Sequence, residues 1–181
     1  MKLLFISDIH GIPENLTKIN QIIKLENIDK LVVLGDLYYA GPNFACSEEV
    51  NIEAVKNFLM SYQDRIICLR GNCDSDVDVK VSDFPICDNL ALIHVDDIDV
   101  YCTHGNEYNI DKSSKFNRKG ILVYGHEHYP YIRKKYDMVY INTGSISLPR
   151  NGSEPSYLIY ENKKFMLYTI HDELIDMIEI K

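Results

Sequence analysis

Short apolar runs that end in Asp, Asn or His are the feature that most constrains this chain. The first run covers residues 2–7 and leads into Asp8-Ile9-His10, an acid and an imidazole two positions apart. In an extended chain this spacing points both side chains to the same side. Taken alone, this pair would favour another interpretation, in which Asp8 caps a following helix and His10 lies in a loop. Because comparable clusters follow later runs, we interpret them as ligands of a divalent cation. Those later clusters contain Asp36, Asn72, His104, His126 and His128.

The order of the first elements predicts where these clusters meet. Residues 14–25 carry Leu and Ile at helical spacing and lie between an apolar strand at 2–7 and another at 30–34. A strand, helix and strand in succession form a right-handed unit with parallel strands. Both strands then end at one edge of the sheet, which brings Asp36 towards Asp8 and His10. Ligand sites in such sheets lie just outside that edge.

The remaining chain indicates a single domain over residues 1–181, because no repeat or linker divides it. Residues 37–50 are expected as a loop over the ligand edge, and residues 109–119 as a short helix or loop. Asp96-Asp97 and Asn162-Lys163 are turn signals. The further elements are expected as a helix at 51–62 and strands at 65–70, 90–94, 98–102, 120–124, 131–135, 138–141, 157–161 and 165–170.

Composition excludes several functions. A net charge of −8 argues against binding of extended nucleic acid, which needs a basic surface. The same charge repels phosphate esters unless bound metal supplies positive charge. The chain opens directly on a strand, and no segment resembles a signal peptide or a membrane span. Its five cysteines form no C-x-x-C pair, so we expect reduced thiols and a cytoplasmic protein.

The clusters together carry a family resemblance. They read Asp8-x-His10, Gly35-Asp36, Gly71-Asn72-Cys73-Asp74, Thr103-His104-Gly105 and Gly125-His126-x-His128. This ordered set resembles the motif blocks of the calcineurin-like metallophosphoesterases, over residues 1 to about 160. The start at Met1-Lys2-Leu3, the length, and Cys73 where most of the superfamily has histidine resemble the small bacterial YfcE-type phosphodiesterases.

The resemblance implies a fold and a reaction. The fold would be α/β, a four-layer αββα sandwich of two mixed β-sheets packed face to face, with helices outside. Two divalent ions, usually Mn²⁺ but with Fe, Zn, Ni or Co also known, would generate a bridging hydroxide that attacks a small phosphodiester substrate. A homo-oligomer is compatible with this resemblance. It implies Asp8, His10, Asp36 and His128 as ligands of the first metal, and Asp36, Asn72, His104 and His126 as ligands of the second.

The resemblance also implies catalytic roles for Asn72, Cys73, Asp74 and His104. A thiol, with a reference pKa of about 8.5, is a poor acid at neutral pH, so Cys73 predicts a preference for diesters with good leaving groups. The alternative is that Cys73 is only a small residue beside a ligand. Asp74 either orients the site or caps a helix beginning near Ser75, and we favour the cap.

Other residues are weaker candidates. Arg70 and Arg150 are candidate phosphate clamps, although a solvated surface position or structural pairing is favoured for each. Tyr38, Tyr39 and the loop 41–43 are candidate walls of a substrate cleft.

A second function class is a scaffold with weak or absent catalysis. The small retromer subunit has the fold that the resemblance implies, and it binds partner proteins through its surface. A pure scaffold has no physical need for Asn72 and His104 beside the other ligands, so the sequence favours the enzyme.

Overall fold

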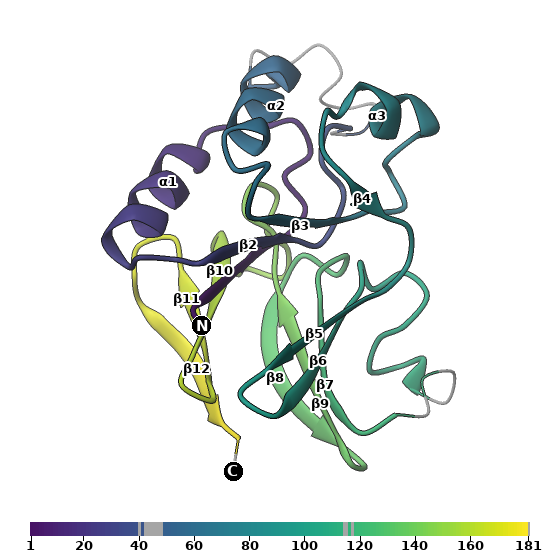
Figure 1. Ribbon diagram of the computed structural model, residues 1–181, viewed down its shortest axis with the longest axis vertical. Helices are drawn as coiled ribbons and strands as arrows, with labels where there is room; N and C mark the ends of the chain where they lie inside the picture. Colours follow the sequence, from purple (N-terminus) through teal and green to yellow (C-terminus); the bar gives the residue numbers. More distant parts are fainter. Residues whose placement is uncertain (40, 42–48, 114–115, 117, 181) are drawn as a thin grey trace.

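The computed structural model describes residues 1–39, 41, 49–113, 116 and 118–180, and two mixed β-sheets dominate it (Figure 1). The seven-stranded sheet has the order β12 (Leu174–Glu179), β11 (Lys164–Thr169), β10 (Ser156–Glu161), β1 (Leu3–Ile6), β2 (Lys30–Val33), β3 (Ile66–Leu69) and β4 (Ile86–Cys87). The five-stranded sheet has the order β5 (Ala91–Val95), β6 (Ile98–Cys102), β7 (Gly120–Tyr124), β9 (Met138–Thr143) and β8 (Pro130–Lys135). The predicted α/β sandwich is confirmed.

Alternation along the central strands builds the core between the two sheets. In β1, Leu3 and Phe5 join the apolar cluster that also contains Val100 of β6 and Val123 of β7. The intervening Leu4 belongs to the cluster under the helices. Because β1 is covered on both faces, its run is continuously apolar rather than alternating with polar residues.

The helices lie on the outer face of the seven-stranded sheet (Figure 1). They are α1 (Leu16–Leu25), α2 (Ile52–Met60) and α3 (Asp76–Val81). Helix α1 begins two residues later than expected, and the Asn15 side chain donates to the Ile146 carbonyl instead of capping the helix. Helix α2 is capped by Asn51, whose side chain accepts the backbone N–H of Ala54 at 2.9 Å.

The outer face of the five-stranded sheet is covered mainly by side chains. Among the described residues, no α-helix covers this face. Leu122 and Tyr124 of β7 point outward there and form an aromatic cluster with Phe116 and other side chains. Tyr108 packs against this cluster, so parts of the segment between β6 and β7 provide the fourth layer. Aromatic side chains therefore bury much of this apolar face.

The predicted connections near the site are confirmed. Strands β1 and β2 pair in parallel, with Leu3 opposite Lys30 and Ile6 opposite Val33. The pairing continues past the strands, because the His10 N–H donates to the Asp36 carbonyl at 2.9 Å. The Asp96-Asp97 turn has positive φ at both residues, as a type I′ hairpin requires.

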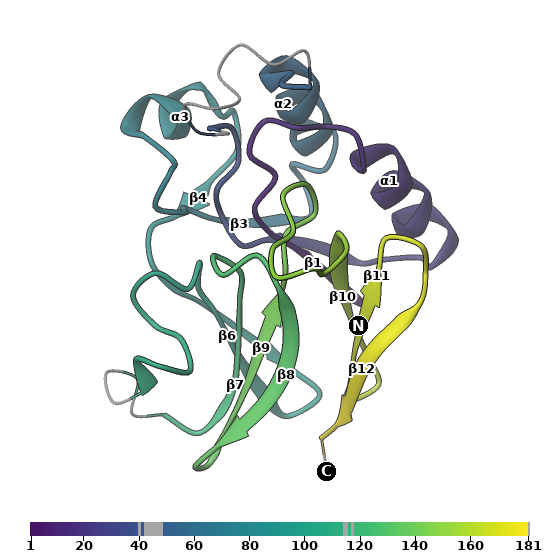
Figure 2. The same cartoon turned by 180° about the vertical axis from the view of Figure 1, so that it is seen from behind.

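Three elements were not assigned from the sequence. Strand β4 has only two residues, and the helix α3 was considered only as the segment that Asp74 would cap. The strand β12 lies at the edge of its sheet (Figure 2). It is mostly exposed and pairs with β11 through a register shift. Its pattern therefore lacks a regular alternation of apolar and polar residues.

The predicted free thiols agree with the structure, since the four described cysteines form no disulfide. Cys46, Pro42 and Asn43 lie outside the described residues. None of the described helices has the length and apolarity that a bilayer-spanning helix needs.

Candidate metal centre

The predicted ligands come from the strand ends of both sheets. In the seven-stranded sheet, β1 leads to Asp8 and His10, β2 to Asp36, and β3 to Asn72. In the five-stranded sheet, β6 leads to His104 and β7 to the other two histidines, which are His126 and His128.

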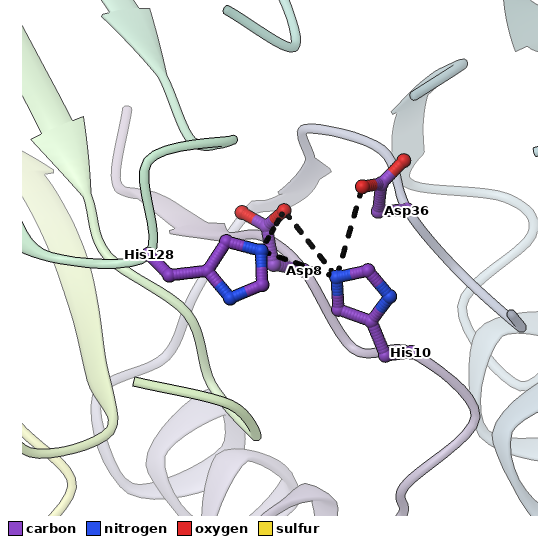
Figure 3. Close-up of side chains that lie close together, drawn as sticks. All are labelled: Asp8, His10, Asp36 and His128. Atoms are coloured by element: carbon purple, nitrogen blue, oxygen red, sulfur yellow. Dashed lines mark hydrogen bonds and ion pairs between the residues drawn. The ribbon is translucent and has the colours of Figure 1, made fainter. Parts of the chain in front are cut away.

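Four of these residues form one buried cluster (Figure 3). Ligand atoms of Asp8, His10, Asp36 and His128 all lie within 4.8 Å of one another. His128 Nε2 is 3.3 Å from Asp8 Oδ1, and His10 Nε2 is 3.7 Å from both Asp8 Oδ1 and Asp36 Oδ2. Two carboxylates and two imidazoles at these distances are suited to one divalent transition metal ion.

A second group adjoins the first at Asp36. His104 Nε2 lies 3.3 Å from Asp36 Oδ2 and 3.0 Å from Asn72 Oδ1. The rings of His104 and His126 are 5.1 Å apart between centroids. The same Asp36 oxygen therefore faces a histidine of the first group and a histidine of the second.

Backbone carbonyls fix the orientation of three imidazoles. Nδ1 donates to Tyr39 O at 2.5 Å in His10, to Leu34 O at 2.8 Å in His104, and to Leu148 O at 2.6 Å in His128. A carbonyl only accepts, so each Nδ1 carries the proton and each Nε2 of the neutral ring presents a lone pair. Metal-ligating histidines are usually oriented in this way.

Unsatisfied atoms test whether a cation fits this cluster. His10 Nε2 and His128 Nε2 face each other at 3.3 Å, and in the neutral rings fixed by the carbonyls both atoms are acceptors. Asp8 Oδ1 is fully buried and has no hydrogen-bond partner among the described residues. A divalent ion would satisfy all three atoms, whereas neutral rings without an ion would leave acceptors opposed to one another. The residues present therefore fit a metal.

The backbone at the ligands is held in an uncommon conformation. Five of the predicted ligands have left-handed φ values between 52° and 65°. This conformation costs each L-residue about 1 kcal/mol of conformational free energy, and such conformations are frequent at functional sites. Sharp turns directly after the strands direct these side chains into the cluster. The five residues are Asp8, His10, Asp36, His126 and His128.

Close packing in the cluster shifts the pKa values of its own residues. Burial opposes ionisation of Asp8, but His10 and His128 outweigh it and hold the pKa of Asp8 far below its usual range. Burial likewise opposes protonation of His104, yet the Asp36 carboxylate raises the pKa of His104 to about 9. For His126, burial and the neighbouring His104 lower the pKa. Protons and cations therefore compete for the same atoms.

Asp74 does not cap a helix, contrary to the favoured interpretation. Ser75 is the N-cap of α3, and its side chain forms a capping box with Asp78. The buried Asp74 carboxylate instead accepts backbone N–H groups of Asp36 at 2.8 Å, Leu37 at 2.7 Å and Gly71 at 2.7 Å. A cap and an orienting carboxylate look alike in the sequence, because both are an Asp just before a helix. Asp74 ties the loop after β2 to the loop after β3.

Close approach explains two glycines of the motifs. A Cβ added at Gly71 would lie 2.1 Å from Asp36 Oδ1, and one at Gly125 would lie 2.4 Å from Asp8 Oδ2. The metal-facing carboxylates therefore pack directly against these two backbones. Any side chain there would displace a ligand.

The structure gives the surroundings of three other candidate residues from the sequence analysis. Cys73 donates its backbone N–H to Asp36 Oδ1 at 2.8 Å, and burial raises the pKa of its thiol to about 12. Arg70 is paired structurally, because its guanidinium contacts the Asp74 carbonyl at 2.9 Å and Asp76 at 2.8 Å. The side chain of Tyr39 is half exposed.

Supporting contacts from the end of β9 and from the loop after it were missed by sequence reasoning. Ser145 Oγ donates to the Asp8 carbonyl at 2.7 Å, and Asn142 Nδ2 donates to the Gly125 carbonyl at 2.6 Å. Both hold the backbone of a ligand loop. The sequence Asn142-Thr143-Gly144-Ser145 signals a sharp bend, but nothing in it shows which loop it contacts.

A two-sheet α/β sandwich with buried carboxylates and oriented imidazoles at its strand ends defines a metal-dependent hydrolase of the phosphoesterase type. The chain belongs to the calcineurin-like phosphoesterase superfamily, whose domain model matches residues 1–164.

Known proteins with the same architecture support this assignment. The chain is 31% identical to phosphodiesterase YfcE of Escherichia coli K12, over 97% of this chain and 95% of that protein. The solved structure of YfcE, a phosphoesterase from E. coli, superposes with a TM-score of 0.92 at 30% identity and covers all of both chains. An archaeal phosphodiesterase has a TM-score of 0.64 at 21% identity, over 99% of this chain and 100% of that one. Vps29 of Entamoeba histolytica, complexed with Zn²⁺, has a TM-score of 0.63 at 17% identity, over 98% of both chains. The last two show the fold alone.

Proposed function

We propose that this phosphoesterase is a phosphodiesterase that hydrolyses small phosphodiesters with two divalent ions. The observation that carries the proposal is the position of Asp36. Its Oδ2 lies 3.7 Å from His10 Nε2 and 3.3 Å from His104 Nε2, so one carboxylate faces both histidine groups. A carboxylate shared in this way suits a two-metal site.

The ligand sets follow from the two groups. One ion would be held by Asp8, His10, Asp36 and His128, and the other by Asp36, Asn72, His104 and His126. A mixture of oxygen and nitrogen ligands accepts Mn²⁺, Fe, Zn, Ni or Co, and of these we propose Mn²⁺. When bound, the ions would lower the pKa of water and offset the negative charge of the phosphate.

Backbone and side-chain groups of the protein prepare the site for that chemistry. The carbonyls of Tyr39, Leu34 and Leu148 keep three imidazoles in the tautomer that presents Nε2. Asp74 holds the two loops that carry Asp36 and Asn72 in register. Pre-positioned ligands lower the reorganisation needed when a substrate arrives.

The substrate class follows from the charge of the chain and from its relatives. A net charge of −8 disfavours a long polyanion, whereas the charge of one phosphodiester group can be met within the site. The relative YfcE is named a phosphodiesterase. Cys73, with its pKa raised to about 12, is a weak proton donor, which favours diesters whose leaving groups need no protonation.

Hydrolysis of bis(p-nitrophenyl) phosphate tests the proposal. Protein stripped with a chelator should be inactive, and Mn²⁺ should restore activity. Asp36→Asn should lower kcat/KM at least about 100-fold, since it weakens both ligand groups. Asp137→Asn, an exposed control paired with Lys119 at 3.4 Å, should leave activity unchanged.

The scaffold alternative predicts a different outcome. Vps29 proteins share the fold at 14–18% identity. If the metal-loaded chain is inert towards diesters while Asp36→Asn leaves stability untouched, a protein-binding role replaces the enzymatic one.

A further inference from the structure

Two cavities flank the turn formed by Asn72 and Cys73. One has a volume of about 370 Å³ and borders Cys73, and the other has a volume of about 410 Å³ and borders Asn72. Both volumes fall within the range of about 300–1,000 Å³ that ligand pockets occupy. Because Asn72 contacts His104 and Cys73 contacts Asp36, both cavities adjoin the candidate metal centre.

The cavity beside Cys73 is apolar. Tyr38, Tyr39, Val50 and Ile52 line it. Tyr39 and Ile52 are each 49% exposed, although both are large apolar side chains. The acidic Asp78 at its rim is already engaged, because its carboxylate accepts from Ser75 in the capping box of α3. An aromatic and an aliphatic wall together suit a flat aromatic ring.

Hydrogen bonds tie this apolar wall to the metal loops. The carbonyl of Tyr39 accepts from His10 Nδ1, so the backbone that carries the exposed ring is fixed to a predicted ligand. Next to Val50, the N–H of Asn51 donates to the Gly11 carbonyl at 2.8 Å. The wall is therefore held at a constant position relative to the centre, as a specificity pocket requires.

The cavity beside Asn72 is polar and has little free charge. Asn89 and Asn106 contribute amides, and Asp88 contributes a carboxylate. Arg70 also lines it, but Asp76 and the Asp74 carbonyl occupy its guanidinium group. Amides beside a carboxylate suit hydroxyl groups better than a second anion.

We infer that the substrate is an unsymmetrical phosphodiester with an aromatic arm and a hydroxylated polar arm. The inference rests on the proposed function, because it assumes that the phosphate lies at the metal centre between the two cavities. The aromatic arm lies against Tyr39 and Ile52, and the polar arm lies against Asn89 and Asn106.

Calorimetric titration of Mn²⁺-loaded protein with stable phosphonates tests each arm without turnover. Benzylphosphonate should bind about tenfold more tightly than ethylphosphonate. Tyr39→Ala and Ile52→Ala should each bring the ratio of the two dissociation constants close to one, while Tyr39→Phe should keep the ratio of the unmodified protein. Tyr39→Ala retains the carbonyl that holds His10. Tyr136→Ala removes an 87% exposed tyrosine elsewhere and should leave the ratio intact.

The polar arm has its own comparison. 2,3-Dihydroxypropylphosphonate should bind more tightly than propylphosphonate, and Asn89→Ala should remove the difference. A benzyl-to-ethyl ratio near one in the unmodified protein, or a ratio unchanged in both pocket variants, overturns the aromatic assignment. A dihydroxypropyl preference that is absent, or that survives Asn89→Ala, overturns the polar one.

Failure of the inference is distinguishable from failure of the proposed function. Hydrolysis of bis(p-nitrophenyl) phosphate without a benzyl preference contradicts the inference alone. A benzyl preference that depends on Tyr39, in a protein that hydrolyses no diester, contradicts the proposed function and leaves the aromatic cavity as a binding site.

Discussion

The backbone N–H of His126 donates to Asp8 Oδ2 at 2.9 Å, which joins residues 118 positions apart in the chain. Asp8 follows a strand of the seven-stranded sheet, and His126 follows a strand of the five-stranded sheet. One oxygen of this carboxylate is therefore used for structure, while its other oxygen, Oδ1, faces the candidate metal position. The hydrogen bond fixes the distance between ligands from the two sheets.

Gly125→Ala should disrupt this relationship. The added Cβ would lie 1.9 Å from Ser7 Oγ and 2.4 Å from Asp8 Oδ2, so the carboxylate must move. We expect Mn²⁺ affinity, measured by calorimetric titration, to fall at least about tenfold. Gly152→Ala is the control, because nothing lies within 4 Å of its added Cβ and only its positive φ opposes the change. Equal affinities in the two variants would contradict the close-approach explanation.

Asp74→Asn should destabilise the protein even without metal. The carboxylate accepts three buried N–H groups, and an amide in its place has only one oxygen to accept them. We expect the free energy of unfolding in urea to fall by about 3 kcal/mol. The exposed Asp76, which pairs with Arg70, supplies a control, since Asp76→Asn should cost less than about 1 kcal/mol. A helix-capping role for Asp74 would give a loss no larger than the control.

Metal loading should release protons at neutral pH. Asp36 raises the pKa of His104 to about 9, so the metal-free protein binds a proton there at pH 7. Calorimetry in two buffers of different ionisation enthalpy should count that proton, and the apparent affinity should rise between pH 6 and about pH 9. Since His94 is exposed and pairs with Asp99, His94→Gln should not change the count. Proton release that stays at zero across this pH range would exclude a protonated His104.

The metal-free protein should show the opposite trend in stability. Because folding raises the pKa of His104, protonation of this residue stabilises the folded state, fully so below the unfolded pKa of about 6.5. This contribution is lost as the pH rises through the folded pKa of about 9. Thermal unfolding of chelator-treated protein should therefore begin at a lower temperature at pH 9 than at pH 6.5. His104→Asn removes the pair with Asp36, so it should reduce the difference in unfolding temperature between pH 6.5 and pH 9. The loss should be reversed by saturating Mn²⁺, which adds about 2.7 kcal/mol at a hundredfold excess over Kd.

Cys73→His should change the choice between ester classes. An imidazole protonates a leaving alkoxide near neutral pH, whereas the thiol, with a pKa of about 12, does not. We expect the ratio of alkyl monoester to aryl diester hydrolysis to rise. Cys87→Ser, at an exposed cysteine, should leave the ratio unchanged. An unaltered ratio in Cys73→His would indicate that Cys73 is only a small side chain beside a ligand.

The sequence predicted the positions of the ligands better than their supports. Asp8, His10 and Asp36 follow continuous apolar runs, and the rule that parallel strands end at one sheet edge was enough to bring them together. That rule does not identify Leu148 O or Ser145 Oγ, because backbone carbonyls and loop hydroxyls leave no distinctive pattern. The predicted second ligand group stays a prediction that the proposed experiments address.

Local ambiguity accounts for the remaining differences. Asp74 precedes a helix in the sequence, and this position fits either a helix cap or a contact with the loop after β2. The two roles could not be distinguished before the fold was known. Strand β12 lies at a sheet edge and exposes Leu174 and Met177, so its pattern lacks the burial signal of the central strands. Tertiary contacts decided both cases.

The division of the centre between two sheets also determines when it can form during biosynthesis. Asp8, His10 and Asp36 are translated early, but His104 and His128 follow only after more than half of the chain has emerged. The proposed ligand sets therefore become complete only when the late strands have docked onto the earlier ones. A chain truncated before His104 would therefore lack ligands of both proposed sets, and it should bind Mn²⁺ more weakly than the full chain.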